Sequence, residues 1–128
     1  MNSEGINAVL KRTKERSNLY RHLQLSWFVV HYAAGTSAIV AAALAAISDS
    51  TEVPLIIQQN TWLWGLLATV LTGVVTFLNP LQKARDYKKS YYEIYSGIQK
   101  YEANMIDIER LVAILEAAQE RILKLNTE

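Results

Sequence analysis

The 13 Lys and Arg residues of this chain leave a long central gap, because none lies between Arg21 and Lys83. This gap holds two apolar runs, and the short loop between them has only two charged residues, Asp49 and Glu52. Basic residues near the ends of a membrane-spanning helix stay on the cytoplasmic side. The charge pattern therefore predicts a two-span helical hairpin with both ends in the cytoplasm.

Both apolar runs are long enough to cross a membrane. Residues 23–47 would form a helix about 37 Å long, and the second run is densest from Trp62 to Leu78. A hydrocarbon core about 30 Å thick needs roughly 20 residues. The mean hydropathy of the whole chain is only +0.06 because the charged ends dilute it. A soluble bundle with two buried helices is the alternative, but such helices seldom run this far without a charge.

We therefore expect an all-α membrane protein with five segments. Ser3 or Asn2 could cap a helix at the start, which favours a short amphipathic helix over a disordered tail. Pro80 follows the second span and can open a new helix or kink a continuous one. The segments are a basic cytoplasmic segment (1–22), a first span (23–47), a short outer loop (48–61), a second span (62–79) and a long cytoplasmic helix (80–128).

Small residues recur at helical spacing in both spans. In lipid, such stripes let helix backbones approach closely. They predict either tight packing of the hairpin, contacts between subunits or a pore lining, although alanine is also common in membrane helices. The stripe residues are Ala34, Ala38 and Ala42 in the first span and Gly65, Thr69 and Gly73 in the second.

His31 lies about two turns into the first span. Ionisable residues at membrane depth often have a function, and a neutral imidazole costs less to bury than a charge. His31 could line a polar pore or sense pH near neutrality. The alternative is a neutral histidine that donates one hydrogen bond to a neighbouring helix.

Apolar residues spaced by three and four continue from Ala84 to Ile122, which predicts one long helix with a single buried seam. A break at Ser96–Gly97 is the alternative, although the register continues across Gly97. A chain this short offers the seam few partners, so we expect it to be an oligomer interface. The seam residues are Tyr87, Tyr91, Ile94, Ile98, Tyr101, Met105, Ile108, Val112 and Leu115. The basic residues flanking the spans are Arg21, Lys83, Arg85, Lys88 and Lys89.

Patterns typical of catalysis are missing from the sequence. The chain has no cysteine, which excludes thiol chemistry and disulfides. It has no glycine-rich phosphate loop, nucleophile elbow or HExxH motif. We expect neither an enzyme, nor a cofactor, nor a metal site. The net charge of +1 and the position of the basic residues argue against a nucleic-acid partner.

The order of these parts resembles the SLATT family, which comprises two-transmembrane domains found beside SMODS nucleotidyltransferases and SLOG nucleotide-sensing proteins. The resemblance covers residues 12–125, and its most specific part is the span exit "FLNPLQKARDYKKSYYEIYSGI". It implies a membrane effector in prokaryotic conflict or antiviral defence systems, which forms pores or perturbs the membrane when a nucleotide signal is sensed. It also implies a location in the bacterial inner membrane. Because no sensor domain is attached to the resembling segment, we expect either a separately encoded sensor protein as partner or another trigger.

Three functions follow from this interpretation. The first is a homo-oligomeric, pore-forming effector of the inner membrane. The second is a non-conducting membrane anchor or scaffold whose cytoplasmic helix recruits a partner protein. The third is a holin-like lysis protein, which would need less cytoplasmic helix than this chain has.

Overall fold

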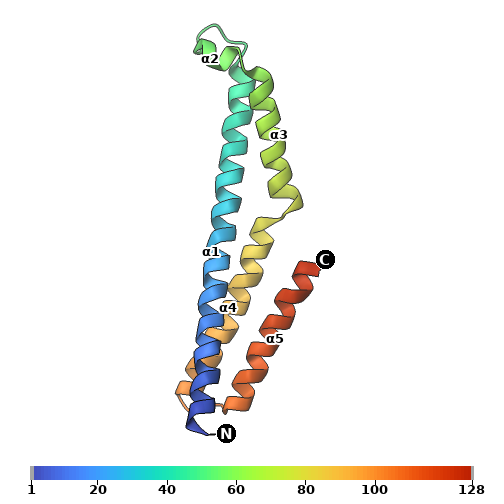
Figure 1. Ribbon diagram of the computed structural model, residues 1–128. Helices are drawn as coiled ribbons and strands as arrows, with labels where there is room; N and C mark the ends of the chain where they lie inside the picture. The colour runs from blue at the N-terminus through green and yellow to red at the C-terminus, as the bar shows by residue number, and fades with distance from the viewer. Residues whose placement is uncertain (1, 128) are drawn as a thin grey trace. The chain divides into compact units, whose positions relative to one another are not determined.

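Every regular element that the computed structural model describes, over residues 2–127, is a helix (Figure 1). This confirms the predicted all-α class. The outermost residues of the two predicted terminal segments, 1 and 128, lie outside the described residues. In chain order the helices are α1 (Ser3–Ile47), α2 (Leu55–Gln58), α3 (Thr61–Phe77), α4 (Pro80–Glu102) and α5 (Ile108–Thr127).

The chain divides into two compact units. The bundle unit consists of Met1–Trp27 and Gln82–Glu128, and the hairpin unit is Phe28–Leu81. Two helical stretches, Ser3–Ile47 and Thr61–Glu102, are long and apolar enough to cross a membrane. The second stretch comprises α3, the junction at Leu78–Asn79 and α4. The coarse expectation of an all-helical chain with two such helices is therefore confirmed.

The predicted amphipathic segment and the first span form one continuous helix, α1. Asn2 caps its start, because the Asn2 side-chain oxygen accepts a hydrogen bond from the Gly5 N–H at 2.9 Å. No proline occurs between Ser3 and Ile47, so no residue removes a backbone donor from the helical ladder. The segment at 1–22 is thus not a separate helix.

The bundle unit is built from the N-terminal half of α1 together with α4 and α5, which lie side by side (Figure 1). Apolar residues of all three form its core, and small polar residues such as Thr13 and Ser90 are also fully buried. The buried apolar cluster is Tyr20, Ile94, Ile98, Leu111, Ala118 and Ile122. Half-buried residues packed against it are Leu10, Leu23, Tyr87, Tyr91, Tyr101, Ile106, Ile108, Leu115 and Leu125.

The prediction of one long helix over residues 80–128 is wrong. Pro80 opens α4, but that helix ends at Glu102 and α5 begins at Ile108. The alternative break at Ser96–Gly97 is wrong as well, because both residues lie inside α4. The two helices fold back on each other and share the core of the bundle unit.

Two caps build the turn between α4 and α5. Asn104 adopts the left-handed conformation with a φ of 58°. Its N–H donates to the Tyr101 carbonyl at 2.9 Å, and the Met105 N–H donates to the Lys100 carbonyl at 2.9 Å. This is the hydrogen-bond pattern of a Schellman motif. Asp107 then caps α5, because its side chain accepts a hydrogen bond from the backbone N–H three residues later at 2.9 Å.

In the hairpin unit, the C-terminal half of α1 and α3 lie side by side, joined by the loop that contains α2 (Figure 1). The loop is held by Gln58, whose side-chain amide donates to the carbonyls of Ser50 at 3.1 Å and Val53 at 2.8 Å. The predicted outer loop, 48–61, therefore contains one short helix and has its own internal hydrogen bonds.

Candidate functional site

The first candidate surface is the outside of the hairpin unit. The 17 residues of α3 include no charged residue and no buried residue. Val70 is 54% exposed and Phe77 is 88% exposed, and on α1 Ile39 is 72% exposed. Exposed apolar area of this extent is typical of a surface that contacts lipid or another protein.

The C-terminal half of α1 buries small residues along a line that differs from the predicted stripe. Ala34, Ala38 and Ala41 are buried, whereas Ala42 is exposed. An α-helix has 3.6 residues per turn, so residues spaced strictly by four drift around its surface. Within this chain the contact line therefore steps from residue 38 to residue 41, and Ala42 points away from it.

The Gly65–Thr69–Gly73 stripe makes no close helix contact within the described chain. A Cβ added at Gly65 would meet nothing within 4 Å, and one at Gly73 would meet only the Phe77 ring of the same helix at 3.9 Å. The Thr69 hydroxyl donates to the Gly65 carbonyl at 2.9 Å. The expected tight packing of this stripe against the first span is absent from residues 2–127, so its small side chains are open to a neighbour.

His31 lies half-buried in the hairpin unit beside Tyr32, with the two ring centroids 5.2 Å apart. Its Nδ1 atom is buried and has no hydrogen-bond partner among residues 2–127. The alternative, in which His31 donates one hydrogen bond to a neighbouring helix, is therefore not realised through Nδ1 within the described chain. A role for His31 in a pore or in pH sensing stays a prediction.

The five predicted juxtamembrane basic residues belong to the bundle unit. Lys83 places its Nζ 4.6 Å from the centroid of the Trp27 ring, and Lys88 places its Nζ 6.0 Å from that of Tyr92. Cations over aromatic faces are attracted by the ring quadrupole. None of the five forms an ion pair within residues 2–127. The other three, Arg21, Arg85 and Lys89, are exposed.

The predicted oligomer seam packs mostly inside the chain. Ile94 and Ile98 are buried in the core, while Met105 is 72% exposed at the turn and Val112 is half-buried. The remaining members, Tyr87, Tyr91, Tyr101, Ile108 and Leu115, are half-buried against the same core. The fold-back of α5 thus supplies α4 with the partner helix that the sequence argument assigned to another subunit.

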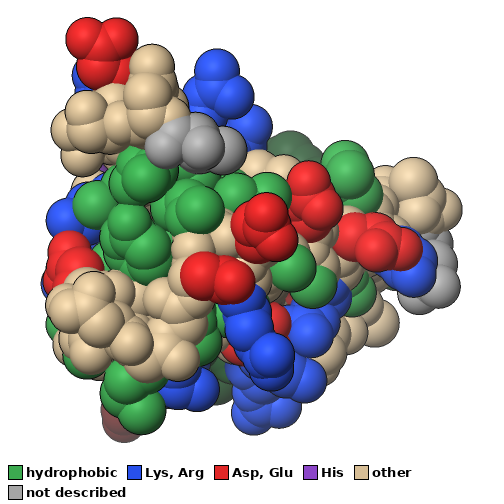
Figure 2. All heavy atoms as spheres, turned by 90° about the horizontal axis from the view of Figure 1, so that it is seen from below, with side chains coloured by type: hydrophobic (Ala, Val, Ile, Leu, Met, Phe, Trp, Pro, Cys, Tyr) green, Lys and Arg blue, Asp and Glu red, His purple; other side chains and the backbone are tan. Residues whose placement is uncertain are grey.

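The surface hollows of the bundle unit include two grooves between pairs of helices. The α1/α5 groove has a volume of about 590 Å³, and its lining includes Val9, Arg12, Glu15 and Leu19 of α1 and Val112, Leu115 and Glu116 of α5. The α4/α5 groove has a volume of about 650 Å³, and its lining includes Lys88, Lys89, Lys100 and Ile114. The end of this unit that holds the α4–α5 turn shows acidic and basic side chains interspersed around a hydrophobic group (Figure 2). Each groove is lined by both apolar and charged side chains, and protein–protein interfaces combine these two kinds of side chain as well.

Tyr20 joins α1 to the core, and its ring centroid lies 5.8 Å from that of Tyr87 on α4. Burial raises the pKa of Tyr20 above 10.0, against the opposing effect of the nearby Arg16 charge. Leu10, in the same basic segment, packs against the same core. These two apolar residues are the signal that could have indicated a helix docked on the bundle.

Sequence reasoning missed both caps of the α4–α5 turn. The signals were Asn104, a residue type that adopts positive φ readily, and Asp107, a preferred helix N-cap, three residues apart. Among residues 2–127, no group of three or more His, Cys, Asp or Glu side chains could hold a metal ion.

Comparison of this chain with known proteins found no matching family model, no matching curated protein and no matching solved structure.

Proposed function

We propose that this chain is an integral membrane protein whose hairpin unit spans the bilayer and whose bundle unit lies in the cytoplasm. The observation that supports this most directly is α3, a helix of 17 uncharged residues none of which is buried. At about 1.5 Å per residue it is roughly 26 Å long, close to the thickness of a hydrocarbon core. In water the apolar side chains that α3 exposes would be solvated at a cost in free energy, whereas in a bilayer they would contact acyl chains.

The distribution of basic residues supports the orientation. All 13 Lys and Arg residues belong to the bundle unit, whereas the loop between α1 and α3 has only acidic charges, Asp49 and Glu52. Under the positive-inside rule, the bundle unit with both termini stays cytoplasmic and the loop crosses the membrane.

The activity we propose is that of a membrane-bound assembly module. The hairpin unit holds the bundle unit at the membrane, and the grooves of the bundle unit bind protein. Two observations favour this over the pore-forming effector. The predicted seam packs within the chain, so it does not by itself call for other subunits. The hydroxyls of Thr69 and Thr72 donate their protons to carbonyls of their own helix, so neither donor is free for a permeating ion or for water.

Site-directed labelling tests the membrane assignment. The chain has no cysteine, so single-cysteine variants can be labelled in intact cells with a membrane-impermeant maleimide. Asp49→Cys should react from outside, whereas Ser3→Cys and Asn126→Cys should react only after the membrane is permeabilised. Protein released from membranes by alkaline carbonate, or terminal cysteines labelled from outside, would refute the assignment.

A pore is the second candidate, because the Gly65–Thr69–Gly73 stripe is left open to another helix and small residues at this spacing favour helix association in lipid. In this proposal several hairpins assemble around a channel as an effector of prokaryotic defence, the activity that the SLATT resemblance implies. Liposomes containing the chain should then leak ions. Gly73→Leu should reduce this ion flux, whereas the control Val70→Leu should leave it unchanged. Intact liposomes under every condition of assembly would exclude this candidate.

A further inference from the structure

The α1/α5 groove continues along the bundle unit into a second hollow. This adjoining cavity has a volume of about 290 Å³ and shares Arg16 and Leu19 with the first. Leu19 is 44% exposed and Leu123, which lines the second cavity, is 66% exposed. The bundle unit therefore has an elongated, partly apolar groove between α1 and α5. Grooves of this kind bind further helices in other proteins.

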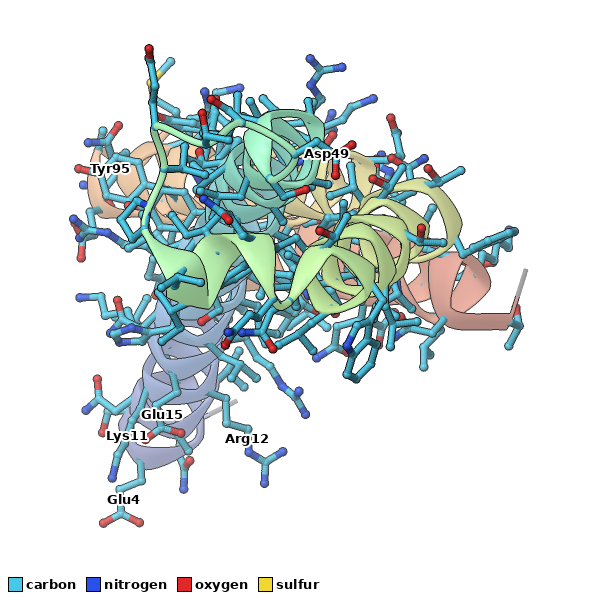
Figure 3. All side chains as sticks on the ribbon, turned by 90° about the horizontal axis from the view of Figure 1, so that it is seen from above. Glu4, Lys11, Arg12, Glu15, Asp49 and Tyr95 are labelled. Atoms are coloured by element: carbon cyan, nitrogen blue, oxygen red, sulfur yellow. The ribbon has the colours of Figure 1, made fainter. Side chains whose placement is uncertain are left out.

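The net charges of the two edges of this groove are opposite. Arg12, Glu15 and Arg16 lie on the α1 edge, and Glu116 lies on the α5 edge. None of these four side chains forms an ion pair within residues 2–127. Seen from above, Arg12 projects outward from α1 (Figure 3). The groove thus has a net positive charge on one edge, where two arginines outnumber one glutamate, and a negative charge on the other.

We propose that the occupant of the α1/α5 groove is the same groove of a second copy of this chain. Two copies inserted in one bilayer with the same orientation are related by an axis along the membrane normal, so a two-fold pair keeps its helices parallel. Such a rotation sets α1 of each copy against α5 of the other. Arg12 and Arg16 then face Glu116 of the second copy, twice in the pair, and Leu19 lies against the apolar wall that includes Leu123.

The other large groove does not fit a second copy in this way. The α4/α5 groove is lined by Lys88, Lys89 and Lys100. Its one carboxylate, Glu93, already pairs with Arg121 at 2.6 Å. Two such surfaces would bring like charges together, which is unfavourable. Charge complementarity therefore selects the α1/α5 groove as the surface for self-association.

A charge-exchange experiment tests this surface with the full chain in lipid nanodiscs, where native mass spectrometry gives the number of copies. The variant R12E/R16E makes both edges of the groove acidic, and E116R gives both edges a net positive charge, since Glu15 remains beside Arg12 and Arg16. Each variant alone should self-associate about tenfold more weakly than the wild type or worse, because the facing edges then have net charges of the same sign. An equimolar mixture of the two should restore pairs, all of which contain one chain of each kind.

Matched variants separate the surface from general effects. Leu123→Ser should weaken pairing, whereas Met105→Ser should not, since both residues are exposed but only Leu123 lines the groove. Lys89→Glu in the other groove should also leave pairing unchanged. Recovery in the mixture shows that the variants are folded.

The inference depends on the proposed membrane function, and its failure is distinguishable from failure of that function. A chain that inserts in the membrane but stays monomeric, or whose association ignores the groove variants, overturns the inference alone. A chain that is water-soluble overturns the membrane assignment. Association with mixed pairs restored between the two charge variants supports both.

Discussion

Gly97 sets how closely α5 approaches α4. A Cβ added at this position would lie 3.3 Å from side-chain atoms of Ile114 and Leu111. Leu111 is fully buried and belongs to the core, so it has little room to move away. Gly97, considered above as a possible helix break, is instead a contact point in an unbroken helix, where a larger residue would require Ile114 and Leu111 to shift.

We expect Gly97→Val to destabilise the bundle unit by about 1–3 kcal/mol, because the added methyl groups overpack the contact between α4 and α5. Thermal unfolding of the chain in detergent, followed by circular dichroism, measures the effect. Ser96→Val is the matched control, since Ser96 is exposed on the same helix. Equal melting temperatures for the two variants would show that α5 does not pack at Gly97.

Tyr20 makes the stability of the bundle unit sensitive to alkaline pH. Burial raises its pKa above 10.0, so the folded chain keeps the phenol proton at a pH where the unfolded chain loses it. This contribution is complete below pH 10 and declines as pH rises through the folded pKa. We expect the free energy of unfolding of the wild type to fall more steeply above pH 10 than that of Tyr20→Phe. Tyr92→Phe, in which the replaced ring is 56% exposed, should keep the wild-type slope; a shared slope for both variants would contradict the assignment.

The α4–α5 turn shows why a continuous hydrophobic register does not imply a continuous helix. Both helices bury one face in the same core, so apolar residues keep a spacing of three and four on each side of the turn. Local chemistry decides between the two structures. Asn104 takes the left-handed conformation, Asp107 caps α5, and Ile106 and Leu111 pack in one cluster on either side of the cap. The last pair has the positions of a hydrophobic staple.

Substitutions in this turn distinguish a hairpin from a straight helix. Asp107→Ala and Asn104→Ala should each lower stability by about 1 kcal/mol, because the first removes an N-cap and the second replaces asparagine, which tolerates positive φ, with alanine, which tolerates it less well. Asn104→Gly should be neutral. In a continuous helix, both alanine variants would instead raise stability, since alanine is the better helix former.

Spin labels provide a direct distance for the same test. Ser96 and Ala117 both line the α4/α5 groove, so labels attached through cysteines at these positions should lie close together. In one straight helix they would be about 32 Å apart. A distance near the longer value would contradict the hairpin.

Which elements could be predicted depends on whether the signal was local or tertiary. The charge gap between Arg21 and Lys83 and the apolar runs within it set the two long helices, and these are present. The small-residue face was found to within one position, Ala41 instead of Ala42, because spacing by four approximates a period of 3.6. The α1/α5 groove could not be predicted, since it exists only after α5 folds back onto the bundle.

At the scale of the whole molecule, the two units have opposite surface chemistry. The bundle unit buries apolar stripes and presents Lys, Arg, Asp and Glu outward, as a soluble helical unit does. In the hairpin unit, the only buried positions on α1 are small residues such as Ala34 and Ala38, while large apolar side chains point outward. One chain thus combines a surface suited to water with one suited to lipid, and the boundary in α1 lies at Trp27–Phe28.

A single charge at the centre of α3 tests this division. Val70 is 54% exposed near the middle of that helix. In a bilayer, Val70→Lys should disfavour membrane insertion by about 2.5–3.5 kcal/mol, which lowers the carbonate-resistant fraction of the protein in membranes. Met105→Lys, at a site that is 72% exposed in the bundle unit, should leave that fraction unchanged because its side chain already faces water. If α3 were a surface helix of a soluble protein, both substitutions would be harmless and would improve solubility, so equal behaviour of the two variants would place α3 in water.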